Sequence, residues 1–497
     1  MKRRDFLNTS LLAAAASALP AYAAVTTGEV ADVLAITGDG REVTLRGADI
    51  KALAGKMRGP LLRAGDNGYD SARLIMNPAF DKRPALIAQP SGSTDVQAAV
   101  EFARAHNLLV AVKCGGHSAS GQSSCDRGLL IDLVNMRGVR VNPGERRAWV
   151  EGGSLLGQVD HETAPHGLFA PLGTVSHTGV GGLTLGGGFG RLARKFGMSI
   201  DNVESVDIVT ADGKLRHASA RENQDLYWAV RGGGGNFGVV TSFEFKLHPM
   251  QREVIAGSLR FPYERARDVL GMYAEYAAKA PDDLYMDPDI SLPPGGAPGE
   301  VGIEICYSGP HDKAEAVLAP LRKLGKPARD TIKVNDYVRV QRWNDTRDPR
   351  AFGSYLKGGF MTKMSDKLVS ALVDNFPADP GRFSVVFFQH CGGAASRVAE
   401  NATAFAQRDS LANMMAVSAW RQGQDEPAPH MQAIRQYWST LEPFTRGFYV
   451  NDLAREVTAR ELNSNWRGNY QRLLGIKQTY DPTNLFRLNA NIQPASA

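Results

Sequence analysis

The stretch KCGGHSASGQSSCDRGLLIDL, residues 113–133, places two glycines directly before a histidine and between two predicted strands. The strands are residues 109–112 and 129–133, which are short and apolar. The two glycines carry no side chain, so the backbone there can approach a ligand closely. The stretch therefore predicts a ligand-binding loop that leads to His117.

Two further stretches are equally rich in glycine: GVGGLTLGGGFG at residues 179–190 and GGGGNFG at residues 232–238. Each can present bare backbone N–H groups to an anion. A dinucleotide site of the Rossmann kind would gather its glycines in one βαβ unit, whereas these are spread along the chain. The phosphate-loop pattern G-x-x-x-x-G-K-[ST] is absent from the sequence. We therefore predict a long ligand with a pyrophosphate, laid across several loops.

Composition limits the class of protein. The chain has 497 residues, 43% apolar and 22% charged, which is typical of a globular protein with two domains. The net charge is +5, but no basic run occurs outside the N-terminus, so we predict no nucleic-acid partner. Four cysteines are too few for a disulfide framework. The spacing of Cys114, His117 and Cys125 fits no common zinc pattern, and we predict no metal site.

The first 23 residues are predicted to be an export signal. Twin arginines in KRRDFL are followed by an apolar run at residues 11–19 and by the cleavage pattern Ala-Tyr-Ala at residues 21–23. The run is too short to span a bilayer, so we predict no stable membrane insertion. The twin-arginine route exports folded proteins, and it predicts a periplasmic or secreted bacterial protein that meets the export machinery only transiently. An ordinary secretory signal is the alternative.

Strands and helices are mixed along the chain, which predicts the α+β class. A helix at residues 93–106 repeats apolar residues on one face, and residues 205–210 and 214–217 form a predicted hairpin. From about residue 251 to 446 the glycine clusters thin out, which indicates a second domain. There, residues 404–420 are predicted to be a strand that lines a cavity. A helix at residues 470–480 ends at Asp481-Pro482.

With the motifs in this order, the chain resembles the FAD-linked oxidases of the vanillyl-alcohol oxidase superfamily, and within it the berberine-bridge-enzyme-like family. The resemblance rests on KCGGHSASGQSSCDRGLLIDL, GTVSHTGVGGLTLGGGFGRLARKFG, LYWAVRGGGGNFGVVTSFEFKLHP and NYQRLLGIKQTYDPTNLFRLNANI. It implies a two-part FAD-binding domain of the PCMH type at residues 80–250. An α+β substrate domain with an antiparallel sheet would follow at 251–446, and the segment 447–494 would return to complete the FAD site.

The resemblance also implies what His117 does: in this family the histidine of the G-G-H-S loop bonds covalently to the 8α-methyl group of FAD. A neutral imidazole is a competent nucleophile, in agreement with that role. Some relatives form a second bond from a cysteine at the position of Val175, so a single link is predicted here. Thr178 occupies a position that controls oxygen access. The resemblance assigns these residues to the cofactor: Cys114, Gly115, Gly116, His117, Ser118, Gly121, Gln122, Gly173, Thr174, Val175, Thr178, Gly179, Gly182, Gly188, Val239, Asn489 and Asn491.

For catalysis, the resemblance points to Tyr449 and Asp452 in GFYVND and to Lys357 in SYLKGGF. Tyr449 would act as base or hydrogen-bond donor, and a phenol needs a nearby cation such as Lys357 to lower its pKa for that task. The implied reaction is hydride transfer from a CH–OH or CH–NH group to flavin N5, with reoxidation by oxygen to hydrogen peroxide.

Three alternatives stay open on the sequence. The protein would be a dehydrogenase that passes electrons to a quinone or another acceptor, a flavin-binding protein without turnover, or a nicotinamide-dependent reductase. The partners predicted in the main hypothesis are a small-molecule substrate and oxygen. The sequence does not identify the substrate.

Overall fold

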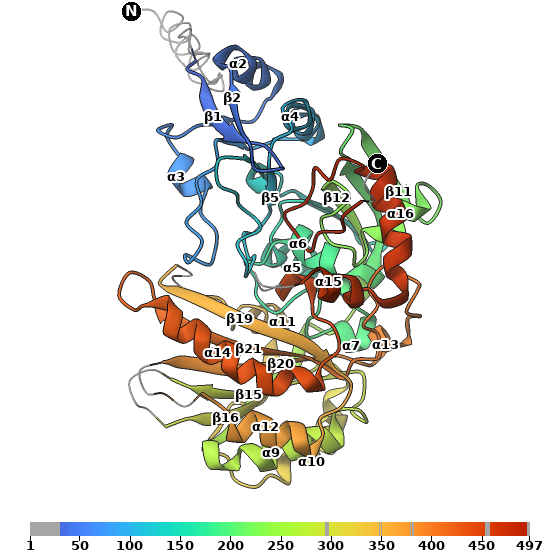
Figure 1. Cartoon of the computed structure of the whole chain (residues 1–497). Helices are drawn as coiled ribbons and strands as arrows, with labels where there is room; N and C mark the ends of the chain where they lie inside the picture. The colour runs from blue at the N-terminus through green and yellow to red at the C-terminus, as the bar shows by residue number, and fades with distance from the viewer. Residues whose placement is uncertain are drawn as a thin grey trace, which may run out of the picture.

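The computed structural model describes residues 30–293, 298–346, 348, 350–377, 379, 382–452 and 458–494. The predicted export signal at residues 1–23 lies outside the described residues. The chain forms two lobes, one above the other in Figure 1. We call residues 30–249 together with 458–494 the glycine-rich lobe, and residues 250–446 the sheet lobe. Within the described ranges, no helix combines the length and apolar content that a bilayer crossing requires.

The first part of the glycine-rich lobe is a four-stranded sheet in the order β3-β4-β6-β5. β4 and β5 both pair in parallel with β6, and every residue of β6 is buried, as parallel strands covered on both faces require. The helix α4 connects β4 to β5 and packs its apolar face into the core. The elements are β3 (Leu61–Leu62), β4 (Leu86–Ala88), α4 (Ser93–Ala105), β5 (Val110–Lys113) and β6 (Leu129–Asp132). The predicted helix and strands of this region are therefore present.

This core also includes residues before position 80, where the predicted FAD domain begins. The hairpin β1 (Val33–Ile36) and β2 (Glu42–Leu45) leads into α2 (Gly47–Lys56). Ile50 and Leu53 of α2 are buried in the same hydrophobic cluster as the apolar face of α4. The N-terminal segment is thus part of the glycine-rich lobe.

The second part of this lobe is an antiparallel sheet in the order β11-β10-β12-β8-β7. The predicted hairpin is its β10–β11 pair, in which Val209 lies opposite Leu215. Three helices and the C-terminal helices pack on this sheet to form one buried cluster. The strands are β7 (Val139–Asn142), β8 (Arg147–Glu151), β10 (Val203–Val209), β11 (Leu215–Ser219) and β12 (Val239–Lys246), and the helices are α5 (Leu156–Thr163), α6 (Val180–Gly186) and α8 (Gln224–Ala229).

The tail returns to the glycine-rich lobe, as Figure 1 shows for α15 (Ala459–Asn465) and α16 (Tyr470–Tyr480). α16 has the predicted bounds. After it, the buried carboxylate of Asp481 accepts hydrogen bonds from the backbone N–H of Leu485 and Phe486 at 2.7 and 2.9 Å. The same carboxylate pairs with Lys477 at 2.7 Å. This network ends the helix and turns the following residues back into the lobe.

The sheet lobe is built on a large antiparallel sheet in the order β17-β14-β16-β15-β20-β21-β19, with β18 also paired to β14. Four helices cover one face of the sheet and share its core: α9 (Ala266–Tyr276), α10 (Ala314–Arg322), α12 (Asp366–Asp374) and α14 (Pro427–Leu441). The strands are β14 (Glu253–Pro262), β15 (Leu284–Leu292), β16 (Glu300–Tyr307), β17 (Arg329–Asp330), β18 (Lys333–Asp336), β19 (Phe352–Met361), β20 (Phe383–His390) and β21 (Ala412–Arg421).

Successive side chains of each strand point to opposite faces of the sheet, so one set packs under the helices and the other faces the glycine-rich lobe. In β20, Val386 and Phe388 are buried under the helices, whereas Phe387 and Gln389 point to the other face. That second face is turned toward the glycine-rich lobe, and it forms one wall of the cavity described below.

The predicted strand at residues 404–420 is wrong in its first half, because β21 begins only at Ala412. Residues 404–411 are irregular and are held by tertiary contacts. Arg408 forms a buried ion pair with Asp201 at 2.7 Å, and the backbone N–H of Phe405 donates to Arg231 O at 3.3 Å. These contacts with the glycine-rich lobe decide the local structure more strongly than the apolar pattern does.

Candidate active site

A cavity of about 460 Å³ lies between the two lobes. All three glycine-rich stretches contribute to its wall, together with the C-terminal tail and the uncovered face of the large sheet. One side of the cavity is therefore formed by the loops that the sequence predicts to bind a long ligand, and the other side is formed by the sheet lobe.

The loop before His117 needs its glycines for close packing of backbone on backbone. A Cβ atom on Gly115 would lie 2.3 Å from the backbone nitrogen of Gly179, and one on Gly179 would lie 2.4 Å from Cys114 Sγ. Gly116 has φ +70°, a conformation that side-chain-bearing residues rarely adopt. This packing brings the first two glycine-rich stretches together and fixes the position of His117 beside them.

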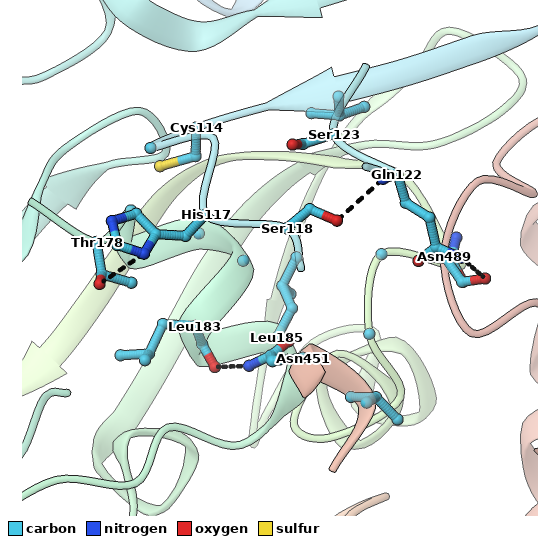
Figure 2. A pocket seen from close by; sticks show the side chains of 18 of the residues that line it. Cys114, His117, Ser118, Gln122, Ser123, Thr178, Leu183, Leu185, Asn451 and Asn489 are labelled. Atoms are coloured by element: carbon cyan, nitrogen blue, oxygen red, sulfur yellow. Dashed lines mark hydrogen bonds between the residues drawn. The ribbon is translucent and has the colours of Figure 1, made fainter. Parts of the chain in front are cut away.

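His117 lines the cavity, and both of its ring nitrogens have a neighbour. Nε2 lies 2.7 Å from Nδ1 of His177, and Nδ1 lies 3.5 Å from Thr178 Oγ1, the contact drawn in Figure 2. Burial lowers the pKa of His117 to about 4, and the neighbouring His177 adds to this effect. His117 is therefore a neutral imidazole near pH 7, which leaves one nitrogen lone pair for a nucleophilic or hydrogen-bonding role.

Several polar groups of the cavity wall can bind a ligand. Ser118 Oγ accepts a hydrogen bond from the backbone N–H of Gln122 at 2.9 Å, and the Gln122 amide reaches Asn489 O at 3.2 Å, so the first loop and the tail are tied together (Figure 2). Ser123 Oγ and Asn489 Oδ1 are buried without a hydrogen-bond partner in the protein. Buried polar atoms are rarely left unpaired, so these two indicate bonds to a bound molecule.

Tyr449 lines the cavity, and hydrogen bonds hold its hydroxyl group in place. Its hydroxyl oxygen accepts hydrogen bonds from the backbone N–H of Gly188 and from the Asn451 amide, both at 2.8 Å. The ring packs edge-on against Phe189 and Phe360, with centroids 5.3 and 6.2 Å away. Burial raises the pKa of Tyr449 above its ordinary value, and the hydrogen bond from Gly188 opposes this only in part. The phenol is thus a poor proton acceptor near neutral pH.

Asp452 is a partly buried carboxyl group in the cavity wall, to which Leu356, Phe387 and Met415 also contribute. Asn413 Nδ2 donates to Asp452 Oδ2 at 2.9 Å. Burial raises the pKa of Asp452 to about 6. The group is therefore mostly ionised at pH 7 and basic enough to accept a proton from a bound molecule.

Comparison with known proteins identifies the family. Residues 84–219 match the FAD binding domain family, and residues 463–493 match the family of berberine and berberine-like domains. An FAD-linked oxidoreductase of Dictyostelium discoideum is 31% identical over 441 residues, which cover 88% of this chain and 95% of that protein. The chain belongs to the berberine-bridge-enzyme-like family of FAD-linked oxidoreductases.

Two other relatives support this assignment. The crystal structure of 6-hydroxy-D-nicotine oxidase from Arthrobacter nicotinovorans superimposes with a TM-score of 0.80 at 28% identity, covering 88% of this chain and 98% of that one. Glucooligosaccharide oxidase of Sarocladium strictum is 28% identical and covers 86% of this chain and 91% of that protein. The predicted family, the fold of an FAD-binding domain with a substrate domain, and an FAD-dependent oxidoreductase are confirmed.

The residues of the cavity fit FAD. Gly182 and Gly235 both line the wall, and a Cβ atom on either would meet no protein atom within 4 Å. Such side-chain-free surface leaves room for a broad cofactor, and Gln122, Ser123 and Asn489 offer polar groups along it. The hydride-accepting flavin of this oxidoreductase would be held by the His117 loop, the second and third glycine-rich stretches and the tail.

Most of the residues that the sequence assigns to the cofactor gather in this wall. Those that line it are Cys114, Gly115, Gly116, His117, Ser118, Gln122, Gly173, Thr174, Val175, Thr178, Gly179, Gly182, Val239 and Asn489. Three others lie behind it. Gly121 binds Lys82 through its carbonyl oxygen at 2.6 Å, Gly188 donates to Tyr449, and Asn491 keeps a buried Oδ1 without a partner in the protein.

Lys357 does not join Tyr449 and Asp452 in the cavity wall. It lies on β19 opposite Ala416, whereas its neighbour Leu356 lines the cavity, so alternation turns the two side chains to opposite faces. Against the effect of burial, hydrogen bonds from Thr458 lower the pKa of Glu461 on α15, and the charge of Lys357 adds a smaller part. The structure thus separates Lys357 from the task of lowering the pKa of Tyr449, which is shifted upward instead.

Cys114 and His117 line the cavity, whereas Cys125 lies apart from them. Burial raises the pKa of Cys114 to about 11 and that of Cys125 to about 12, so both are thiols rather than thiolates near neutral pH. Cys125 packs in a separate apolar cluster with Tyr69 and Leu130. In the part of the chain that the structure describes, no group of three or more His, Cys, Asp or Glu side chains is placed to hold a metal ion.

Sequence reasoning missed several residues of the site. Gly234 and Gly235 lie in the third glycine-rich stretch, and Asn451 sits between the two predicted catalytic residues, so motif position was a usable signal for them. Phe387 and Met415 carry no such signal, because the sequence alone does not tell which face of a strand meets the other lobe. His177 also escaped notice, since its contact with His117 joins two loops that lie 60 residues apart.

Proposed function

We propose that this oxidoreductase is an oxidase that converts a CH–OH or CH–NH group of a small molecule and passes the electrons to oxygen. The observation that carries the proposal is Asp452, a partly buried carboxyl group that lines the cavity and accepts a hydrogen bond from Asn413. Two similar proteins are named as oxidases, one of hydroxynicotine and one of glucooligosaccharides. Their names cover both an amine and an alcohol substrate.

Bound FAD supplies the acceptor for a hydride and returns the two electrons to oxygen as hydrogen peroxide. The protein supplies the proton acceptor: Asp452 takes the proton of the O–H or N–H bond as the neighbouring C–H bond is oxidised. For an alcohol the balance is R₂CHOH + O₂ → R₂CO + H₂O₂. Asn413 Nδ2 holds the carboxylate in place through a hydrogen bond of 2.9 Å to Oδ2.

Tyr449 then has a positioning role. Its hydroxyl joins the backbone of Gly188 to Asn451, and the Asn451 amide also reaches Leu183 O at 3.1 Å. These bonds fix the second glycine-rich stretch, which lines the cofactor cavity, against the segment that carries Asp452. The predicted role of Tyr449 as base is therefore replaced in our proposal by Asp452.

We further propose that His117 carries the FAD covalently, as a single link. The neutral imidazole, its place in the cavity wall and the glycine-rich surface of the same cavity support this role. In the net reaction one hydrogen leaves the 8α-methyl carbon, one leaves the imidazole, and a C–N bond forms. Oxygen takes both hydrogens and both electrons as hydrogen peroxide.

Export through the twin-arginine route remains part of the proposal. It rests on residues 1–23, whose twin arginines, apolar run and cleavage pattern are typical of such signals. That route accepts folded proteins, so FAD would be inserted before export. A covalent link then prevents loss of the cofactor in a compartment without an FAD supply.

The first experiment is acid precipitation of the mature protein purified with its flavin. Yellow colour in the pellet of the wild type and in the supernatant of His117→Ala is the expected result, and colour in the wild-type supernatant would refute the covalent link. A panel of alcohols, sugars and amines is then screened by peroxide release. Flavin reduction that oxygen fails to reverse, but a quinone does, would replace the oxidase with a dehydrogenase.

A further inference from the structure

His117 is in hydrogen-bond contact with a second histidine, His177, which can take part in the attachment of FAD. We infer that His177 accepts the proton of His117 Nε2 when the flavin bond forms, and that the bond forms at Nδ1. This inference rests on the proposed covalent link. It concerns a residue on the loop before the second glycine-rich stretch, for which neither the motif nor the proposed oxidation provides a role.

The geometry distinguishes the two ring nitrogens of His117. Nε2 is 2.7 Å from Nδ1 of His177, so one nitrogen donates and the other accepts. Nδ1 has only the longer contact of 3.5 Å with Thr178 Oγ1, and Thr178 itself lines the cofactor cavity. If Nε2–H donates to His177, the lone pair of Nδ1 is left for the flavin. Bond formation at Nδ1 would make the His117 ring cationic, and transfer of the Nε2 proton to His177 restores its neutrality.

The surroundings of His177 suit it to receive that proton. Its Nε2 atom is buried without a hydrogen-bond partner in the protein and lies 4.0 Å from Asp345 Oδ1. At this distance the carboxylate stabilises an imidazolium. Ser176 holds the carboxylate there, through its backbone N–H at 2.8 Å and its hydroxyl at 2.6 Å. Asp345 thus places a carboxylate beside Nε2 of His177, whereas His117 contacts Nδ1 of the same ring.

A second cavity, of about 410 Å³, offers the proton a way out. His177 and Ser176 line it, and its lining shares no residue with the cofactor cavity that His117 lines. Arg137 and Arg342 also line this second cavity, and their charges oppose a cation there, whereas Asp345 forms the ion-pair contact with His177. The two histidines therefore form a bridge between the two cavities, with the acid next to the outer histidine.

The proton balance follows the net reaction given above. The hydrogen that leaves the imidazole of His117 passes as a proton to His177 Nδ1 and then to solvent in the second cavity. The hydrogen that leaves the 8α-methyl carbon and the two electrons pass to oxygen, which also takes up one proton from solvent. The products are the histidyl-linked cofactor and hydrogen peroxide.

The test follows covalent attachment over time. Full-length mature protein is produced under riboflavin limitation, mixed with FAD under air, and sampled for flavin that stays on the denatured chain. His177→Asn keeps an acceptor for His117 but takes up no proton, and we expect attachment at least 10-fold slower than in the wild type. His161→Asn alters another histidine of the second cavity, one that lies beside Glu162 while His177 contacts His117, and this variant should attach FAD at the wild-type rate.

Two further measurements separate proton transfer from mere support of the loop. Free imidazole added to His177→Gly should restore attachment at least several-fold, because the vacated space adjoins the second cavity. The histidyl-flavin released by hydrolysis should be substituted at Nδ1 by NMR. Asp345→Asn retains an acceptor for Ser176, and we expect it to slow attachment several-fold even if His177→Asn fails to bind FAD.

The outcomes are distinguishable. Wild-type attachment rates in His177→Asn, or in Asp345→Asn where the first variant does not bind FAD, would overturn the inference, and so would substitution at Nε2. In those cases the covalent link to His117 stands. A wild type without covalent flavin would overturn both the link and the inference.

Discussion

Two glycine-to-alanine changes provide the sharpest test that the cavity holds FAD, because the structure assigns them opposite effects. They are made in the His117→Ala background, where FAD binding is reversible. Gly182 lies within α6 and lines the cavity, and a Cβ atom there would meet no protein atom within 4 Å. Gly115 also lines the cavity, but its Cβ atom would lie 2.3 Å from the nitrogen and 2.8 Å from the Cα atom of Gly179.

For Gly182→Ala we expect an apoprotein at least as stable as its parent, since alanine improves a helix interior by about 0.5–1 kcal/mol. The new methyl group intrudes only on space for the cofactor. An overpacking cost of about 1–3 kcal/mol then weakens FAD binding by about 5- to 150-fold. For Gly115→Ala the same cost falls on the protein itself, because backbone atoms cannot rotate away. We expect the Tm of the apoprotein to fall by about 2–6 °C.

The assays are thermal unfolding of the apoproteins and titration with FAD, followed by quenching of flavin fluorescence. The reasoning is refuted if Gly182→Ala lowers the apoprotein Tm as much as Gly115→Ala does. It is equally refuted if Gly182→Ala binds FAD with the affinity of its parent, since the cofactor would then lie elsewhere.

Three further predictions concern the catalytic groups. Asp452 must be ionised to accept a proton, and burial raises its pKa to about 6, so kcat/KM should rise with pH through about 6. We call this rise the acid limb. Asp452→Asn should abolish the acid limb and lower kcat/KM above it about 100-fold or more. Asn413→Ala removes the hydrogen bond that lowers the Asp452 pKa, so the rise in kcat/KM should move to a pH about one unit higher. If the rise stays at the same pH, it reports the ionisation of another group. Tyr449→Phe leaves the Gly188 N–H and the Asn451 amide without their acceptor, so Tm should fall by a few degrees while the limb near pH 6 persists, whereas its disappearance would restore Tyr449 as the base.

The cofactor side of the site could be predicted from sequence because its requirements are local. Gly115, Gly116 and Gly182 are needed where backbone meets backbone or ligand, and such needs leave glycine clusters that are visible without a structure. The helix at residues 470–480 was equally visible, since Asp481-Pro482 is a strong local stop signal.

The substrate side could not be predicted, because its requirements are tertiary. Phe387 and Met415 lie opposite each other on β20 and β21, and which face of the sheet meets the cavity depends on where the helices α9, α10, α12 and α14 pack. Lys357 illustrates the same point: a shift of one residue along β19 separates it from Leu356 and from the cavity. Burial raises the pKa of Tyr449 and, among the described residues, no cation opposes it there, and the degree of burial is a property of the folded site that the sequence does not reveal.

The tail has a consequence for the order of events during synthesis. Asn236 holds Ala490 O at 3.0 Å and the backbone N–H of Ile492 at 2.9 Å, across more than 250 residues of sequence. Asn489 belongs to the cavity wall, so a nascent chain lacks one side of the cofactor site until residue 489 has left the ribosome. We therefore expect a growing chain that ends before this segment to bind FAD more weakly than one that contains it.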